Sequence, residues 1–161
     1  MRRVLLVAAL LLACVARADG TVLKPFQRGS VQAIVEARHG RPFILSFWSV
    51  DCAHCYRELE QLAALAKAYP QLDLVLVSTD TPASEKEITA TLSRYALTHA
   101  ERWVFADDFV ERLRFEVDPR WHGELPRAYL YGPGKRIETL TGKPDPGRLT
   151  RWLRANGYGS D

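Results

Sequence analysis

The chain alternates between two patterns of apolar and polar residues, one typical of buried strands and the other of helices. Five runs predict strands, at residues 43–49, 72–77, 103–106, 128–131 and 137–141. The first two are almost continuously apolar, as expected for strands that are covered on both faces. The turn sequence Gly132-Pro133-Gly134 separates the last two and predicts an antiparallel hairpin.

Segments with apolar residues at helical spacing flank or separate these strands. The predicted helices begin near Ser30, Cys52, Thr81-Pro82, Asp108 and Asp145-Pro146. Ser30 is a residue type that caps helix N-termini, and Asp108 with Glu111 predicts a capping box. Helices alternating with strands predict one α/β domain, with a mostly parallel, mixed central sheet flanked by helices on both faces.

The first residues are typical of an export signal. Two arginines precede an apolar run over residues 4–15, and residues 16–18 form a small-x-small cleavage site. The apolar run is too short to span a bilayer as a helix. We therefore expect residues 1–18 to be a signal peptide and residues 19–161 to be a domain that works in the periplasm.

A competing interpretation of the same segment involves Cys14. The sequence Leu-Leu-Ala-Cys that ends at this residue resembles a bacterial lipobox, in which Cys14 would carry a lipid anchor. Either form of processing would place the domain outside the cytoplasm. Removal of the signal peptide would also remove three arginines and lower the formal net charge from +3 to zero, so the charge predicts no nucleic-acid partner.

Cys52 and Cys55 stand where the predicted strand 43–49 gives way to a helix. A helix N-terminus carries unpaired N–H groups and a partial positive charge, which favour a thiolate at Cys52. Cys55, one turn further on, can attack a disulfide formed on Cys52. This arrangement suits thiol–disulfide exchange, and the alternative is a purely structural disulfide. Loss of Cys14 with the signal peptide would leave this pair alone, which favours a working pair over a disulfide framework.

Two motifs resemble the thioredoxin fold, and in particular the exported thiol–disulfide oxidoreductases of the TlpA and ResA type. They are FWSVDCAHC, followed by a predicted helix, and the later sequence GELPRAYLY. The resemblance implies that Cys52 attacks and Cys55 resolves. It also implies that Pro126 is a cis-proline facing the pair and that the backbone of Leu125 pairs with an extended substrate segment. Cis bonds are common only before proline, which agrees with this assignment.

The resemblance also implies roles for residues near the pair. Glu58 shares a helix face with Cys55 and would accept or relay its proton, although a solvated glutamate is the alternative. Ser46 stands where thioredoxin has a buried aspartate, so the proton needs another route. Trp48 is expected beneath the cysteines as a core residue and secondarily as a substrate contact. His54 resembles the residue of oxidising members, and its imidazolium would stabilise the Cys52 thiolate.

We therefore expect a thiol–disulfide oxidoreductase that reduces disulfides in exported proteins. Asp51 opposes the effect of His54, so the direction of electron flow stays open. No flavin or nicotinamide motif is present and neither a cofactor nor a metal is expected, so a membrane thiol donor would resupply the electrons. Cytochrome apoproteins in cytochrome c biogenesis, copper-site proteins and misfolded proteins all present the same thiol chemistry to such an enzyme.

Three other functions are compatible with parts of the sequence. The main alternative is a copper chaperone of the same fold, with Cys52, Cys55 and His122 as ligands. A peroxidase is disfavoured, because Ser49 stands where such enzymes place a threonine. A redox-inactive interaction domain would keep the fold without the exchange chemistry.

Overall fold

The computed structural model describes residues 22–142 and 145–158, in which strands and helices alternate. The strands are β1 (Leu23–Phe26), β2 (Phe43–Trp48), β3 (Leu74–Ser78), β4 (Glu101–Phe105), β5 (Arg127–Tyr131) and β6 (Ile137–Thr141). The α-helices are α1 (Ser30–Glu36), α2 (Cys55–Ala68), α3 (Glu85–Arg94), α4 (Val110–Val117) and α5 (Pro146–Ala155). Two short 3₁₀ turns, η1 (Pro82–Ser84) and η2 (Pro133–Lys135), precede α3 and β6. The predicted signal peptide and Cys14 lie outside the described residues.

All six described strands form one sheet in the order β1-β4-β3-β2-β5-β6. Strands β1, β4, β3 and β2 run parallel to one another, whereas β5 is antiparallel to β2 and pairs with β6 as a hairpin. The prediction of an α/β fold with a mixed central sheet is therefore confirmed.

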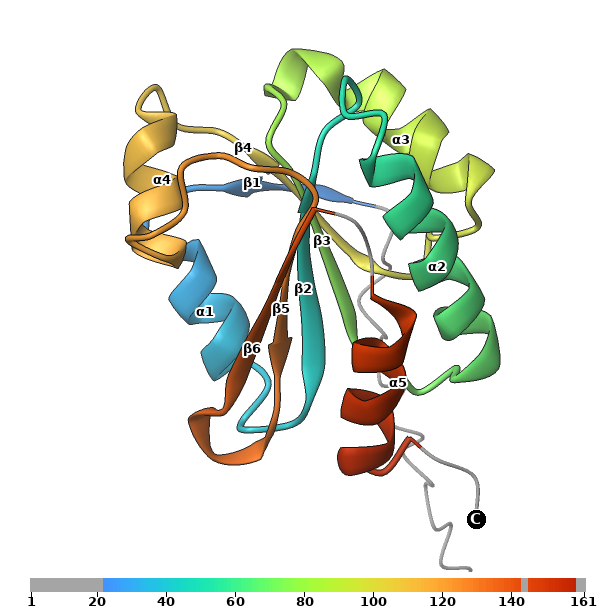
Figure 1. Cartoon of the computed structure of the whole chain (residues 1–161). Coiled ribbons are helices and arrows are strands. Elements are labelled where there is room, and N and C mark those ends of the chain that lie inside the picture. The colour runs from blue at the N-terminus through green and yellow to red at the C-terminus, as the bar shows by residue number, and fades with distance from the viewer. Residues whose placement is uncertain (1–21, 143–144, 159–161) are drawn as a thin grey trace, which may run out of the picture.

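Helices cover both faces of the sheet, with α2, α3 and α5 on one side and α1 and α4 on the other (Figure 1). Side chains of successive strand residues point to opposite faces, so Ile44 joins the apolar cluster under α2 while Leu45 joins the cluster under α1 and α4. Every residue of β2 and β3 is buried as a result. This double coverage explains why both strands have continuously apolar sequences.

Strand β1 escaped prediction because its sequence, LKPF, has neither alternation nor a continuous apolar run. It lies at the edge of the sheet beside β4, where Pro25 is tolerated.

The predicted capping box at the start of α4 is wrong. Phe109 precedes this helix without a side-chain cap, and its amide donates a hydrogen bond to Asp107 Oδ1 at 2.8 Å.

Two helix starts can be compared directly with their predictions. Helix α5 starts at Pro146 as predicted, and Asp145 caps it, because its Oδ1 accepts a hydrogen bond from the amide of Arg148 at 3.1 Å. Ser30 is the first residue of α1 rather than its cap, and its hydroxyl accepts a bond from the amide of Gln27.

None of the helices within residues 22–142 and 145–158 is both long and apolar enough to cross a membrane.

Candidate active site

The two cysteines follow the carboxyl end of β2 and are joined by a disulfide bond. Their sulfur atoms are 2.09 Å apart and their Cα atoms 5.3 Å apart. Cys52 is partly exposed, whereas Cys55 is 0% exposed. A partner can therefore reach the sulfur of Cys52 more readily than that of Cys55. This is the asymmetry required of an attacking and a resolving cysteine.

Helix α2 begins at Cys55, so the prediction that it begins at Cys52 is wrong. The residues before it form turns, in which the amide of Cys52 donates to Ser49 O and the amide of Cys55 donates to Cys52 O. The Cys55 amide also lies 3.2 Å from Cys52 Sγ. The first amide of the helix is thus directed at the sulfur of Cys52, where an N–H group favours a thiolate.

The turn before the cysteine pair is held by Asp80, a residue that sequence reasoning missed. The Asp80 carboxylate accepts hydrogen bonds from Ser49 Oγ at 2.8 Å, from the Val50 amide at 3.0 Å and from Ser78 Oγ at 2.5 Å. The hydroxyl of Tyr56 donates to the carbonyl of Val50 in the same turn. The position of Asp80, two residues after a buried strand, was the available signal, because neighbouring parallel strands open onto the same edge of a sheet.

Glu58 is a buried carboxyl group, so the alternative of a solvated glutamate is wrong. Its side chain lies on the buried face of α2 that also carries Cys55, and the residue is only 6% exposed. Ser46 Oγ on β2 donates a hydrogen bond to Glu58 Oε2 at 3.0 Å. Burial raises the pKa of Glu58 to about 7, and the bond from Ser46 offsets only part of this effect.

A carboxyl group with a pKa close to neutral can take up and release a proton at physiological pH. Glu58 therefore has the acid strength that a proton acceptor for Cys55 needs. Ser46 stands where thioredoxin has a buried aspartate. Here its hydroxyl donates a hydrogen bond to the carboxyl group of Glu58.

The peptide bond between Leu125 and Pro126 is cis, as the resemblance implies. Arg127 pairs with Phe47 near the end of β2, so Pro126 lies beside the turn that leads to the cysteines. Within residues 22–142 and 145–158, neither the amide nor the carbonyl of Leu125 makes a backbone hydrogen bond. The pairing of the Leu125 backbone with a substrate segment stays a prediction.

Trp48 and His54 differ in their access to a partner. Trp48 is 0% exposed and belongs to the apolar cluster under α2, so its expected core role holds and its secondary role as a substrate contact is wrong. His54 immediately precedes α2, is exposed and makes no side-chain capping bond. Its contact with a substrate stays a prediction.

The loop before Pro126 packs closely onto the sheet. Trp121 is 4% exposed, and its ring centroid lies 4.7 Å from that of Phe47. His122 and Glu124 are exposed on the same loop, and the amide of His122 donates to Glu124 Oε2 at 3.1 Å. Packing on the sheet therefore explains Trp121, while its two polar neighbours face outward.

The copper-chaperone alternative needs His122 to join the two cysteines. Across residues 22–142 and 145–158, no three side chains of His, Cys, Asp or Glu gather into a group that could hold a metal ion. The third ligand of the alternative is thus not assembled in this conformation.

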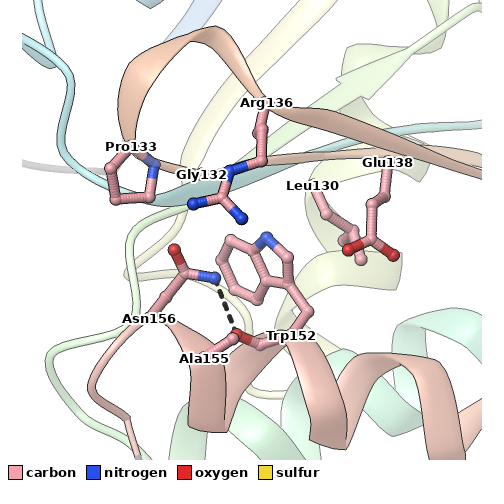
Figure 2. A pocket seen from close by; sticks show the side chains of 8 residues that line it. All are labelled: Leu130, Gly132, Pro133, Arg136, Glu138, Trp152, Ala155 and Asn156. Carbon is pink, nitrogen blue, oxygen red and sulfur yellow. Dashed lines mark hydrogen bonds between the residues drawn. The ribbon is translucent and has the colours of Figure 1, made fainter.

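A separate pocket lies between the β5–β6 hairpin and α5 (Figure 2). It is lined by Leu130, Gly132, Pro133, Arg136, Glu138, Trp152, Ala155 and Asn156. The side-chain amide of Asn156 donates to the carbonyl of Trp152 at 2.7 Å across one wall. Tyr131 at the end of β5 pairs with Phe43 at the start of β2, so this pocket lies at the opposite end of the sheet from the cysteines.

Comparison with known proteins identifies the fold. A scan of protein-family models matches none of them, and a search of curated proteins finds no match. Solved structures do match. DsbF from Mycobacterium tuberculosis is 21% identical with a TM-score of 0.59, and the alignment covers 75% of this chain and 84% of that one. The chain has the thioredoxin fold.

Two further thioredoxin-fold neighbours agree. A secreted disulfide oxidoreductase of M. tuberculosis, homologous to Escherichia coli DsbE, is 21% identical over 72% of this chain and 82% of its own, with a TM-score of 0.56. StoA from Bacillus subtilis is 23% identical over 71% and 83% of the two chains, with a TM-score of 0.50. The described part of the chain thus carries its cysteine pair on the same fold as these proteins.

Proposed function

We propose that this chain is an exported thiol–disulfide oxidoreductase that exchanges its Cys52–Cys55 disulfide with protein partners. One observation carries the proposal. A disulfide joins a partly exposed cysteine to a fully buried one, and the buried one shares a helix face with a carboxyl group of pKa about 7. The thioredoxin fold supports it, because structural neighbours are described as disulfide oxidoreductases.

In the reducing direction, the thiolate of Cys52 attacks one sulfur of a disulfide in the partner. A bond forms between Cys52 Sγ and that sulfur while the partner's disulfide breaks, and the other partner sulfur leaves as a thiolate. Cys55 then passes its proton to Glu58 and attacks Cys52 Sγ. The Cys52–Cys55 disulfide forms, the mixed disulfide breaks, and the second partner sulfur also leaves as a thiolate. The partner leaves as a dithiol after taking up two protons, and two electrons have moved to it from the Cys52–Cys55 pair.

Binding of the partner requires an extended segment next to Cys52. The backbone groups of Leu125 beside Pro126, which bond to no backbone group of residues 22–142 or 145–158, can pair with such a segment as an added strand would. His54 would contact the same segment from the start of α2. These contacts hold the partner's disulfide in line with Cys52 Sγ and leave Cys55 covered.

The location and the electron supply follow from the same proposal. One neighbour is described as secreted, and the sequence begins with a predicted signal peptide. An oxidising compartment outside the cytoplasm does not supply reducing thiols. The protein would therefore receive electrons from a thiol protein in the membrane and act as a reductase in the periplasm.

The decisive experiment compares cysteine variants in the reduction of insulin by dithiothreitol. Cys52→Ser should lose all catalysis above the background rate, because the sulfur of Cys55 is buried and does not reach insulin. Cys55→Ser should form a mixed disulfide with insulin but fail to turn over. Cys14→Ser, made in the full chain, is the matched control and should keep full activity. A Cys52→Ser protein that reduces insulin at the wild-type rate would end the proposal.

A further inference from the structure

A buried ion pair joins the two ends of the segment that leads to Leu125. We call residues 118–125 the Trp121 loop. Arg127, just after this loop, donates from Nη2 to Asp118 Oδ2 at its start, at 2.7 Å. Asp118 is 7% exposed and Arg127 8% exposed. The ion pair thus joins the two ends of the loop and is itself largely shielded from solvent.

Arg127 is fixed in turn by the sheet. Its Nε donates to the hydroxyl of Tyr129 at 2.6 Å, and its Nη1 donates to Thr141 Oγ1 on β6 at 3.1 Å. Burial would raise the pKa of Asp118, but hydrogen bonds from the Arg120 amide and from Arg127 outweigh it and hold that pKa below the usual range. Asp118 therefore keeps its charge at neutral pH, and the loop is tied to strands β5 and β6.

Hydrogen bonds and a ring contact also hold the interior of the Trp121 loop. The amide of Trp121 donates to Asp118 O at 2.9 Å, and its indole Nε1 donates to Glu124 O at 3.1 Å. The indole ring packs on Phe47 of β2. Glu124 immediately precedes Leu125, so this chain of contacts runs from the ion pair to the backbone that a partner would meet.

We propose that Arg127 is a positioning residue for partner binding, which acts through Asp118 to hold the Trp121 loop and present the backbone of Leu125 to an extended polypeptide. The inference rests on the proposed function, because it concerns how that function recognises a protein substrate. It assigns Arg127 to the binding of large substrates and leaves the thiol chemistry of Cys52 to other residues.

A second buried arginine provides a matched control. Arg38 is 5% exposed and donates from Nη2 to Asp73 Oδ1 at 2.8 Å and to Glu101 Oε2 at 2.7 Å. Asp73 precedes β3 and Glu101 begins β4, so this ion pair lies at the amino ends of the parallel strands. Arg38 matches Arg127 in chemistry and burial, although the side chains of its two carboxylate partners are 26% exposed, and it lies at the opposite end of the strands from Cys52.

The test uses Arg127→Met and Arg38→Met proteins with a large and a small disulfide substrate. Insulin reports KM and kcat for a protein substrate, and 5,5′-dithiobis(2-nitrobenzoate) reports direct attack by Cys52. Arg127→Met should raise KM for insulin by about tenfold and leave kcat and the rate with the small disulfide within about twofold. Arg38→Met should leave all three values within about twofold of the wild type.

Folding of the single variant is addressed by a second protein. Asp118→Leu combined with Arg127→Met removes both charges, and apolar replacement of a whole buried ion pair is often neutral for stability. It should show the same rise in KM. An insulin KM at the wild-type value in either protein, or an equal loss of rate with both substrates, would overturn the inference. A wild-type protein that reacts with neither substrate would instead refute the proposed function and, with it, this inference.

Discussion

Glu58 is the residue on which folding has the clearest chemical effect. Its spacing from Cys55 is visible in the sequence, because residues three apart share a helix face. The burial of Glu58 was not predictable from α2 alone, because it depends on packing against β2. Its hydrogen-bond partner Ser46 lies on that strand, twelve residues earlier in the sequence. The one signal in the sequence was Ser46 itself, because a serine inside an otherwise apolar strand indicates a buried polar partner.

The raised pKa of Glu58 makes a prediction for stability. The folded state holds this proton up to about pH 7, whereas the unfolded chain releases it near 4.5. The contribution of Glu58 to the free energy of unfolding should therefore be largest below that lower value and fall as the pH rises to about 7, by an amount on the order of 3 kcal/mol. Glu58→Gln keeps a neutral side chain and should remove this fall, so that it is the more stable protein above about pH 7.

Urea denaturation across this pH range measures the effect. Glu60→Gln, an exposed position on the same helix, is the matched control and should follow the wild type at every pH. Parallel pH profiles for the wild type and Glu58→Gln would contradict the assignment of a buried carboxyl group with a raised pKa.

At the scale of elements, the turn between β2 and α2 shows where sequence patterns stop being informative. The apolar run of β2 and the helical spacing in α2 were both readable. The helix start at Cys55 was not, because the turn before it is shaped by Asp80, which comes from the end of β3. Such a contact between distant segments leaves no local pattern in either one.

The hydrogen bonds of Asp80 predict its contribution to stability. Asp80→Ala would leave the hydroxyls of Ser49 and Ser78 and the amide of Val50 without their acceptor. The oxidised protein should lose about 2–4 kcal/mol of unfolding free energy, since each bond to a carboxylate contributes about 1.5–3 kcal/mol and solvent replaces part of that. Urea denaturation at neutral pH gives this value.

Asp107→Ala provides the comparison for that experiment. Asp107 accepts the amide of Phe109 in an outward-facing turn, so its removal should cost about 1 kcal/mol or less. Equal losses for the two substitutions would mean that Asp80 does not hold the turn before the cysteines.

For the molecule as a whole, the order of strands and helices was largely predictable, and the site depends on that order. Strand β5 runs antiparallel to β2, and this pairing brings Pro126 to the cysteine turn although the two are far apart in sequence. The resemblance of two motifs anticipated this meeting. The ion pair between Asp118 and Arg127 was not anticipated, because nothing in either segment shows that their side chains meet.

The central claim is that Cys52 and Cys55 form a working redox pair rather than a structural disulfide. The most direct test is the reduction potential of the protein, equilibrated in glutathione and dithiothreitol buffers and read by thiol alkylation. We expect a reversible two-electron transition between about −270 mV, as in thioredoxin, and about −120 mV, as in DsbA. A value near the first favours a reductase and one near the second an oxidant, whereas a value below about −300 mV would mark a structural disulfide and contradict the account.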